Sequence, residues 1–200
     1  MTDAAPAEPP RRGRPRSERA RSAILHATAD LMLHRGPGEV SMDAVAQRAG
    51  VSKATIYRWW PSKEMLTLDA LLDWAGSGVP PRDSGSLRTD VLALLLPWVR
   101  EVRREPFGRV IAAFLNQAQS DPEFAEAYLE HFIRPRRAAM AAVFARAAAR
   151  GEVPEDLDVE VALDLIYGAL YHRILTGHAK VTDRFTRGVV DMALRGILVG

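Results

Sequence analysis

The segment AGVSKATIYRWWPSKEML, residues 49–66, places basic, hydroxyl and aromatic side chains close together along a short stretch of chain. Lysine and arginine donate hydrogen bonds to phosphate oxygens and to guanine edges, and hydroxyl groups contact phosphates. Side chains of these types on one exposed face have the chemistry needed to bind nucleic acid. The residues concerned are Lys53, Thr55, Tyr57, Arg58, Trp59 and Lys63.

Basic residues are concentrated at the beginning of the chain. The 200-residue sequence has a formal net charge of only +2, but residues 1–63 hold eleven Lys or Arg against six Asp or Glu. The remainder is slightly acidic. Such asymmetry is expected when one end of a protein contacts a polyanion, although a solvated basic tail would give the same distribution.

The overall composition is that of a globular protein without cysteine. Hydrophobic residues make up 48% of the chain and charged residues 26%, a mixture that allows a substantial core. The lack of cysteine excludes disulfides and thiolate zinc sites. No segment has the pattern of a signal peptide or of a membrane-spanning helix. We therefore expect a cytoplasmic protein.

Capping and helix-ending residues divide the first third of the chain into short helices. The sequence GPGE at 36–39 ends the first helix, Gly50 ends the second, and Pro61 separates the third from the fourth. Two short helices joined by a tight glycine turn are typical of a helix-turn-helix. The predicted N-cap residues are Ser17, Ser41, Ser52 and Ser62.

Helical spacing separates the apolar residues of this region from the polar ones. Val45, Ala46, Ala49, Val51, Ile56 and Trp60 are expected to face the first helix. The outward side then holds the side chains suited to a DNA major groove. Thr55 could instead complete a cap, and Trp59 could instead belong to the core. Tyr57 is expected to contact a DNA phosphate. Lys63 is also expected to contact a phosphate, because it lies at the start of the fourth helix, where backbone N–H groups favour anions.

The stretch VSMDAVAQRAGVSKATIYRWWPSKEML, residues 40–66, resembles the DNA-binding segment of the tetracycline-repressor (TetR) family of bacterial transcription regulators. The resemblance rests on the Ala-Gly-Val-Ser turn, the Thr-x-Tyr of the third helix and the Ser-Lys-Glu that opens the fourth, and it covers about 17–75. Glycine is common in the family where this chain has Ala54, and a smaller or more polar residue is common at Trp59, so the operator sequence stays open. The candidate DNA contacts are Ser41, Lys53, Ala54, Thr55, Tyr57, Arg58, Trp59 and Lys63.

Residues 1–16 are rich in proline, alanine and arginine and are expected to form a disordered basic arm. The sequence RRGRPR at 11–16 resembles an AT-hook, in which arginines enter a narrow A·T minor groove. Arg12, Arg14 and Arg16 would then contact DNA beside each half-site. A solubilising tail is the alternative.

The remaining sequence predicts an all-α protein of about nine helices. Residues 17–63 form the predicted helix-turn-helix domain, and residues 64–200 a second helical domain in which Pro97 should kink or divide its helix. The resemblance implies that this domain holds a small-molecule pocket and a dimer interface formed chiefly by the last two long helices. Glycines within these helical patterns, Gly168, Gly188 and Gly196, fit the close approach of another backbone.

The identity of a ligand is not evident from the sequence. Aromatic residues at helical spacing are candidates for an amphipathic cavity, although each could equally be core. An anionic ligand could be held by Arg134, Arg136 or Arg137, which could also be solvated. The histidines lack the spacing of a metal site. The candidate ligand residues are Trp98, Phe114, Tyr128, Phe132, Tyr167, Tyr171 and His172.

These features predict a homodimeric regulator that represses transcription from a pseudo-palindromic operator and is released by a small-molecule effector. A constitutive or architectural DNA-binding protein is one alternative. A helical enzyme is another, but the sequence has no nucleophile elbow, phosphate-binding glycine loop or convincing acid-base pair. We therefore predict neither catalysis nor a cofactor.

Overall fold

The computed structural model describes residues 14–75, 83–104 and 106–197, and all the regular structure in these ranges is helical. The prediction of an all-α fold is confirmed. The first elements are α1 (Arg14–Arg35), the 3-10 turn η1 (Pro37–Glu39), α2 (Met42–Ala49), α3 (Lys53–Tyr57) and α4 (Lys63–Ala75). They are followed by α5 (Leu87–Val102), α6 (Phe107–Ser120), α7 (Pro122–Tyr128), the π-helical turn η2 (Leu129–Ile133), α8 (Arg134–Ala149), α9 (Val159–Thr176) and α10 (Asp183–Arg195). Because α7, η2 and α8 form one continuous run, the described residues make nine separate helices besides η1.

Three of the four predicted caps form as expected. Ser41, Ser52 and Ser62 each accept a hydrogen bond from the backbone N–H three residues later, over 3.2, 3.2 and 3.3 Å. These bonds satisfy N–H groups that have no partner within their own helix. Gly50 ends α2 with φ at 66°, in the left-handed region that favours glycine.

The predicted start of the first helix is wrong by three residues. Helix α1 begins at Arg14, so Ser17 lies inside the helix and does not cap it. Pro15 is compatible with this start because proline is tolerated in the first turn of a helix. Arg14 and Arg16 therefore belong to α1 and not to an extended arm, whereas Arg12 and the rest of the predicted arm lie outside the described residues.

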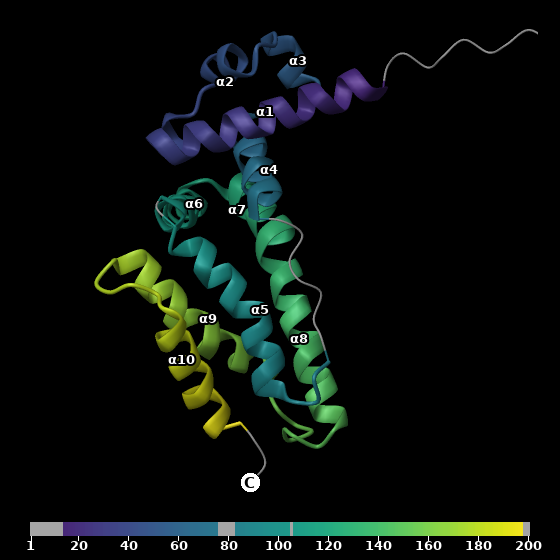
Figure 1. The fold of residues 1–200 in the computed structure, drawn as a ribbon, viewed down its shortest axis with the longest axis vertical. Helices are drawn as coiled ribbons and strands as arrows, with labels where there is room; N and C mark the ends of the chain where they lie inside the picture. Colours follow the sequence, from purple (N-terminus) through teal and green to yellow (C-terminus); the bar gives the residue numbers. More distant parts are fainter. Residues whose placement is uncertain (1–13, 76–82, 105, 198–200) are drawn as a thin grey trace, which may run out of the picture.

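The N-terminal helices form a unit at one end of the molecule (Figure 1). Helix α1 lies across this end, α2 and α3 lie on its outer side, and α4 runs from α1 toward the second domain. One apolar core includes buried residues of α1 to α4 together with residues of α6 and α7. A ring contact between Trp74 of α4 and Phe107 of α6, with centroids 4.2 Å apart, is part of the junction. The two domains thus share side-chain packing.

The two internal prolines have different effects. Pro97 does not divide its helix, because α5 runs without a break from Leu87 to Val102. A proline removes one backbone hydrogen bond, and the burial of Leu95, Leu96 and Val99 around it compensates for that loss. Pro135 is the second residue of α8, one position after the π-helical turn η2 ends and the first residue of α8, Arg134, begins the regular helix. A wider turn is one way for a helix to accommodate a residue that cannot make the regular bond.

None of the helices in the described ranges is long and apolar enough to cross a membrane.

The second core lies between α5, α8, α9 and α10, which run along the length of the molecule. Exposed ion pairs join α10 to α5, with Arg88 to Asp191 and both Arg100 and Arg103 to Asp183.

Candidate functional site

Helix α3 is fixed to the rest of the domain by its buried side. Ile56 is fully buried and Trp60, just after the helix, is 3% exposed. The indole N–H of Trp60 donates to Asp69 of α4 over 2.9 Å, and Arg21 of α1 donates to the same carboxylate over 3.2 Å. The position of α3 is therefore set by both α1 and α4. The role of Asp69 was not evident from the sequence, because it depends on a contact between three separate elements.

The outward side of α3 carries the predicted DNA-reading residues. Lys53, Ala54, Tyr57 and Arg58 are exposed, Tyr57 to 52%. We call these four residues the recognition surface. Lys53 forms an ion pair with Asp43 of α2 over 2.8 Å, and the hydrogen bond that its ammonium group donates to this carboxylate raises the pKa of Lys53 above its ordinary value. The ion pair places the ammonium group at the junction of α2 and α3.

Two predicted contacts, Thr55 and Trp59, are less accessible than the recognition surface. The Thr55 hydroxyl lies 2.9 Å from the Ser52 hydroxyl, so it takes part in the cap of α3. Trp59 is half-buried and packs against the N-terminal core. Its indole nitrogen is buried, and its ring lies 5.9 Å from the guanidinium carbon of Arg58. Both residues are better placed to support the recognition surface than to read bases.

The other predicted DNA contacts of the N-terminal domain, Lys63 and Ser41, lie at the starts of α4 and α2. Lys63 lies 3.8 Å from the carboxylate of Glu64 and is partly exposed. Because only the Met65 N–H is bonded to the Ser62 side chain, other backbone donors of the first turn can face an anion. The Ser41 hydroxyl is engaged with the backbone of α2, and an ion pair between Arg48 and Asp30 connects α2 to α1.

Six of the seven predicted ligand residues come together in the second domain. Ring contacts connect Trp98 to Tyr171 at 5.6 Å, Tyr128 to Phe132 at 5.0 Å and Tyr128 to Phe114 at 6.2 Å. Tyr167 joins the group through Tyr171, with centroids 6.4 Å apart. The rings come from α5, α6, α7, η2 and α9, so these residues, which the sequence analysis named as candidates for a ligand cavity, pack against one another in the core.

His172 does not belong to this group. Its side chain is exposed and its ring lies 5.3 Å from that of His178. Neighbouring residues of a helix point in directions about 100° apart, so Tyr171 and His172 cannot both face the cluster. Within the described ranges no group of three or more His, Asp or Glu side chains is placed to hold a metal ion.

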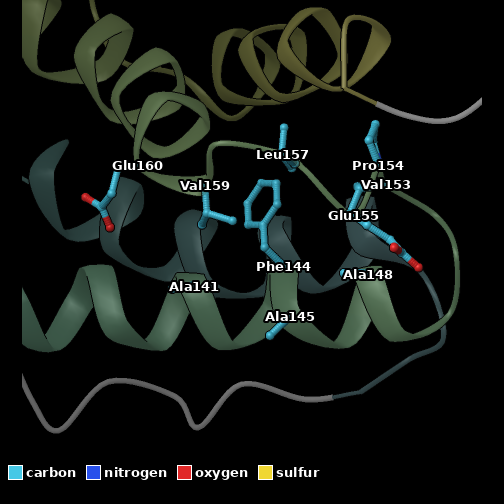
Figure 2. Close-up of a pocket in the computed structure, with 10 residues that line it drawn as sticks. All are labelled: Ala141, Phe144, Ala145, Ala148, Val153, Pro154, Glu155, Leu157, Val159 and Glu160. Carbon is cyan, nitrogen blue, oxygen red and sulfur yellow. The ribbon is translucent and has the colours of Figure 1, made fainter.

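A small hollow lies elsewhere, between α8 and the segment that leads into α9 (Figure 2). Its walls are mainly aliphatic and aromatic, with two carboxylates at the rim. None of the predicted ligand residues lines it, so it does not coincide with the aromatic cluster. The lining residues are Ala141, Phe144, Ala145, Ala148, Val153, Pro154, Glu155, Leu157, Val159 and Glu160.

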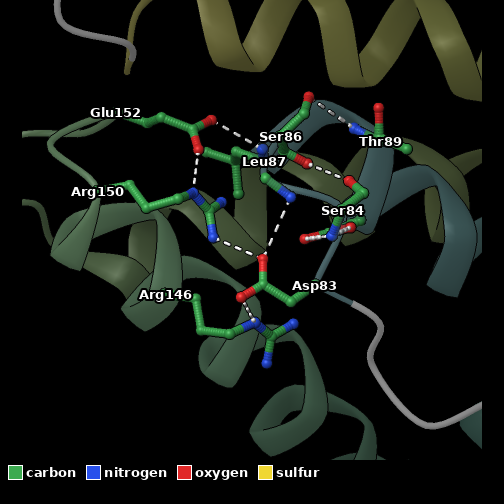
Figure 3. Close-up of polar contacts among 10 residues, drawn as sticks. Asp83, Ser84, Ser86, Leu87, Thr89, Arg146, Arg150 and Glu152 are labelled. Carbon is green, nitrogen blue, oxygen red and sulfur yellow. Dashed lines mark hydrogen bonds and ion pairs between the residues drawn. The ribbon is translucent and has the colours of Figure 1, made fainter.

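A polar network holds the chain beside this hollow (Figure 3). The carboxylate of Glu152 accepts the Leu87 backbone N–H over 2.8 Å at the start of α5, and it accepts Arg150 over 2.6 Å. Arg150 also donates to Asp83 over 2.8 Å. The backbone N–H of Leu87 and, to a smaller extent, the Arg150 guanidinium hold the pKa of Glu152 below its ordinary value. The network ties the end of α8 to the beginning of α5.

These features define a class of protein. A basic, exposed recognition surface lies on a short helix that follows a glycine turn, and the helical domain behind it shares its core with the DNA-binding unit. This is the arrangement of a helix-turn-helix DNA-binding protein with a second, all-helical domain.

Comparison with known proteins identifies the family. Residues 24–70 match the family described as "Bacterial regulatory proteins, tetR family", and residues 81–193 match "Tetracyclin repressor-like, C-terminal domain". The chain is 37% identical over 187 residues to HTH-type transcriptional regulator YdeS of Bacillus subtilis, covering 94% of each protein. It is 30% identical over 181 residues to DNA-binding transcriptional repressor TetR of Mycobacteroides abscessus, covering 90% of this chain and 94% of that protein.

A solved structure supports the same assignment. The TetR family transcription regulator SCO0332 aligns with a TM-score of 0.75 and 36% identity, over 88% of this chain and 97% of that chain. The chain therefore belongs to the tetR family of bacterial regulatory proteins and is a helix-turn-helix transcriptional regulator.

Proposed function

We propose that this regulator binds a pseudo-palindromic operator as a homodimer, represses transcription there and releases the operator when a small molecule binds its second domain. The observation that carries the proposal is the recognition surface: four exposed side chains on a helix whose opposite side is anchored by Ile56 and Trp60. A rigid helix with exposed donors fits a major groove. A bacterial repressor of this kind acts in the cytoplasm, where its DNA lies.

The residues divide into two roles on DNA. Lys53 and Arg58 would contact base edges, with Ala54 against the floor of the groove, because their side chains are exposed along α3. Tyr57 and Lys63 would bind phosphates on either side, helped by the backbone donors at the start of α4. For Lys53 this means that DNA must share or replace the ion pair with Asp43.

The exposed side of α9 and α10 supports the dimer. Val161, Leu165 and Leu175 are each more than half exposed on α9, and Met192 is 75% exposed on α10. Gly168 lies on the same stripe of α9 as these residues, and a Cβ added there would meet nothing within 4 Å in the single chain. An apolar stripe with a glycine at its centre permits close packing of a second copy. Gly188 of α10 is equally open.

The aromatic cluster supports control by a ligand. Tyr128 and Phe132 belong to the same continuous core as the buried residues of α1 and α4, and α7 contacts α4 directly. A molecule inserted among these rings would displace α7 and therefore α4, which holds Asp69 beneath α3. Such a shift changes the separation of the two recognition surfaces in a dimer.

Selection of bound sequences from random duplex DNA at near-physiological salt tests the proposal. We expect an inverted repeat whose half-sites lie about one helical turn, roughly 34 Å, apart. Enrichment of A·T-rich DNA without a repeat would contradict it and favour an architectural protein.

A variant with an enlarged residue at the dimer face sharpens the same test. Gly168→Leu has room for its side chain within one chain, so it should fold, sediment as a monomer and lose the inverted repeat. Ala138→Leu, on the exposed side of α8, is the matched control and should keep both. A dimeric Gly168→Leu protein with the full operator would place the interface elsewhere.

A further inference from the structure

Arg136 differs from the two arginines beside it. Arg134 forms an ion pair with Glu130, and Arg137 forms ion pairs with Glu160 and Asp164. Arg136 has no carboxylate partner in the described part of the chain. Its guanidinium donates to the backbone carbonyl of Phe132 over 2.9 Å and lies 3.7 Å from the centre of the Phe132 ring. Burial lowers the pKa of Arg136 below its ordinary value.

A partly buried cation without a counter-ion destabilises a folded protein, because the loss of hydration is not compensated by a nearby negative charge. The aromatic rings around Arg136 replace only part of that hydration. A residue of this kind fits a site whose negative charge arrives with a ligand.

Further donors belong to the aromatic rings next to this guanidinium: Tyr128 interacts with Arg136 directly, and Trp98 contacts Tyr171, which also interacts with Arg136. Within the described residues, the buried indole nitrogen of Trp98 has no hydrogen-bond partner. The hydroxyl of Tyr128, which is only 3% exposed, lies beside that of Tyr171 without a bond of good geometry. Burial raises the pKa of Tyr167 and of Tyr171 to about 12, so both phenols keep their protons at neutral pH. An indole N–H donates only, a guanidinium donates only, and a protonated phenol can donate. The groups that lack partners here need an acceptor.

We propose that Trp98, Tyr128, Arg136, Tyr167 and Tyr171, the Arg136 cluster, bind the carboxylate of a small organic acid whose apolar body lies among the surrounding aromatic rings. A carboxylate offers two oxygens that can accept several hydrogen bonds, and it forms a two-point contact with arginine. One cation matches one negative charge. Because the ring centroids of Trp98 in α5 and Tyr171 in α9 are 5.6 Å apart, the acid must separate these two rings. This inference names the ligand class for the effector site proposed above and rests on that function.

Thermal unfolding and calorimetric titration of the full chain test the chemical class. The probes are benzoate, 3-phenylpropanoate and octanoate, each paired with its neutral amide. We expect at least one acid to bind and to raise the Tm by several degrees at millimolar concentration, and its amide to bind at least tenfold more weakly. Equal binding of acid and amide, or binding of none of the three acids, would overturn the proposal.

Variants locate the site independently of DNA. Arg136→Met should lower the affinity for the acid at least tenfold, whereas Arg134→Met, on the exposed side of the same helix, should leave it unchanged. Trp98→Phe keeps an aromatic ring without the indole N–H and should weaken binding severalfold, which covers the case that Arg136→Met does not fold. Unchanged affinity in Trp98→Phe and in a folded Arg136→Met would contradict the assignment.

Operator release is measured separately on the selected DNA. An acid that binds through Arg136 and lowers operator affinity supports both proposals. If it binds through Arg136 but leaves operator affinity unchanged, the carboxylate site stands and the effector role is wrong. If the protein selects no operator, the regulatory proposal fails while the binding data still decide the site.

Discussion

The recognition surface and the Arg136 cluster are both sets of hydrogen-bond donors, but they lie in opposite surroundings. Lys53, Tyr57 and Arg58 are exposed, and the charge of Lys53 is already balanced by Asp43. Arg136 and Tyr128 lie among aromatic rings, and Arg136 donates to the backbone carbonyl of Phe132 without a carboxylate partner in the described part of the chain. An exposed hydrogen-bond donor costs the folded protein little stability when no ligand is bound, because water serves as its partner. A buried one is destabilising until a ligand arrives.

The comparison predicts that the two regions respond differently to substitution. Changes on the recognition surface should alter DNA binding and leave folding stability nearly unchanged. Changes in the Arg136 cluster should alter stability as well as ligand binding. The largest effect is expected at the side chain that anchors the recognition surface.

Trp60→Ala should lower the free energy of unfolding by about 3–5 kcal/mol, because it removes a large buried ring and leaves a cavity. It should also abolish operator binding, since Asp69 loses its bond from the end of α3. Trp60→Phe is the matched control that keeps a ring and loses the N–H. Denaturant unfolding measures both variants, and a Trp60→Ala protein within 1 kcal/mol of wild type would show that the anchor is not needed.

Glu152→Gln should lower the free energy of unfolding at pH 7 by about 1 kcal/mol, because the amide is a weaker acceptor for Leu87 and Arg150. The pKa of Glu152 is depressed in the folded protein. The carboxylate therefore contributes fully above its ordinary pKa, and the contribution is lost as the pH falls through the lower folded value. The difference between wild type and variant should shrink at acidic pH. A constant difference from pH 7 to 3 would argue against a charged acceptor.

Arg136→Met should raise the free energy of unfolding by about 1 kcal/mol in the absence of ligand, because it removes a partly buried charge and keeps most of the apolar contact. This prediction separates the two regions most clearly, since Arg58→Ala on the recognition surface should change stability by less than about 0.5 kcal/mol. Parallel urea titrations of the two variants give both values. A large loss of stability in Arg136→Met would mean that the guanidinium has a structural role.

Lys63→Ala should give the smallest effect. Loss of one phosphate contact should weaken operator and scrambled DNA equally and reduce the slope of log affinity against log salt by about one. Tyr57→Phe, which loses a hydroxyl without a charge, should weaken both DNAs and leave that slope unchanged. Affinities at four salt concentrations decide this, and a loss confined to the operator would assign Lys63 to base reading.

The helix boundaries around the recognition surface could be predicted from sequence because they depend on local rules. Each serine cap acts on a backbone group three residues away, and Gly50 marks a conformation that other residues rarely adopt. At Pro97 the sequence left open whether the helix is kinked or divided, and α5 is not divided because burial on both sides of Pro97 compensates for the lost hydrogen bond.

The residues of the Arg136 cluster were predicted only in part. Helical spacing suggested the aromatic rings, but it could not distinguish Arg136 from Arg134 and Arg137. The difference depends on where acidic partners lie, and those of Arg137 come from α9, more than twenty residues away. For the same reason the connection from Trp60 through Asp69 to Arg21 required the tertiary structure.

The most direct test of the account is a second DNA selection with the Lys53→Ala/Arg58→Ala double variant. We assign base preference to the recognition surface and half-site spacing to the proposed dimer interface of α9 and α10. The variant should therefore lose preference at defined positions of each half-site, at a cost of about 1–3 kcal/mol per contact, and keep the inverted repeat with unchanged spacing. Recovery of the wild-type half-site sequence would show that α3 does not read the operator.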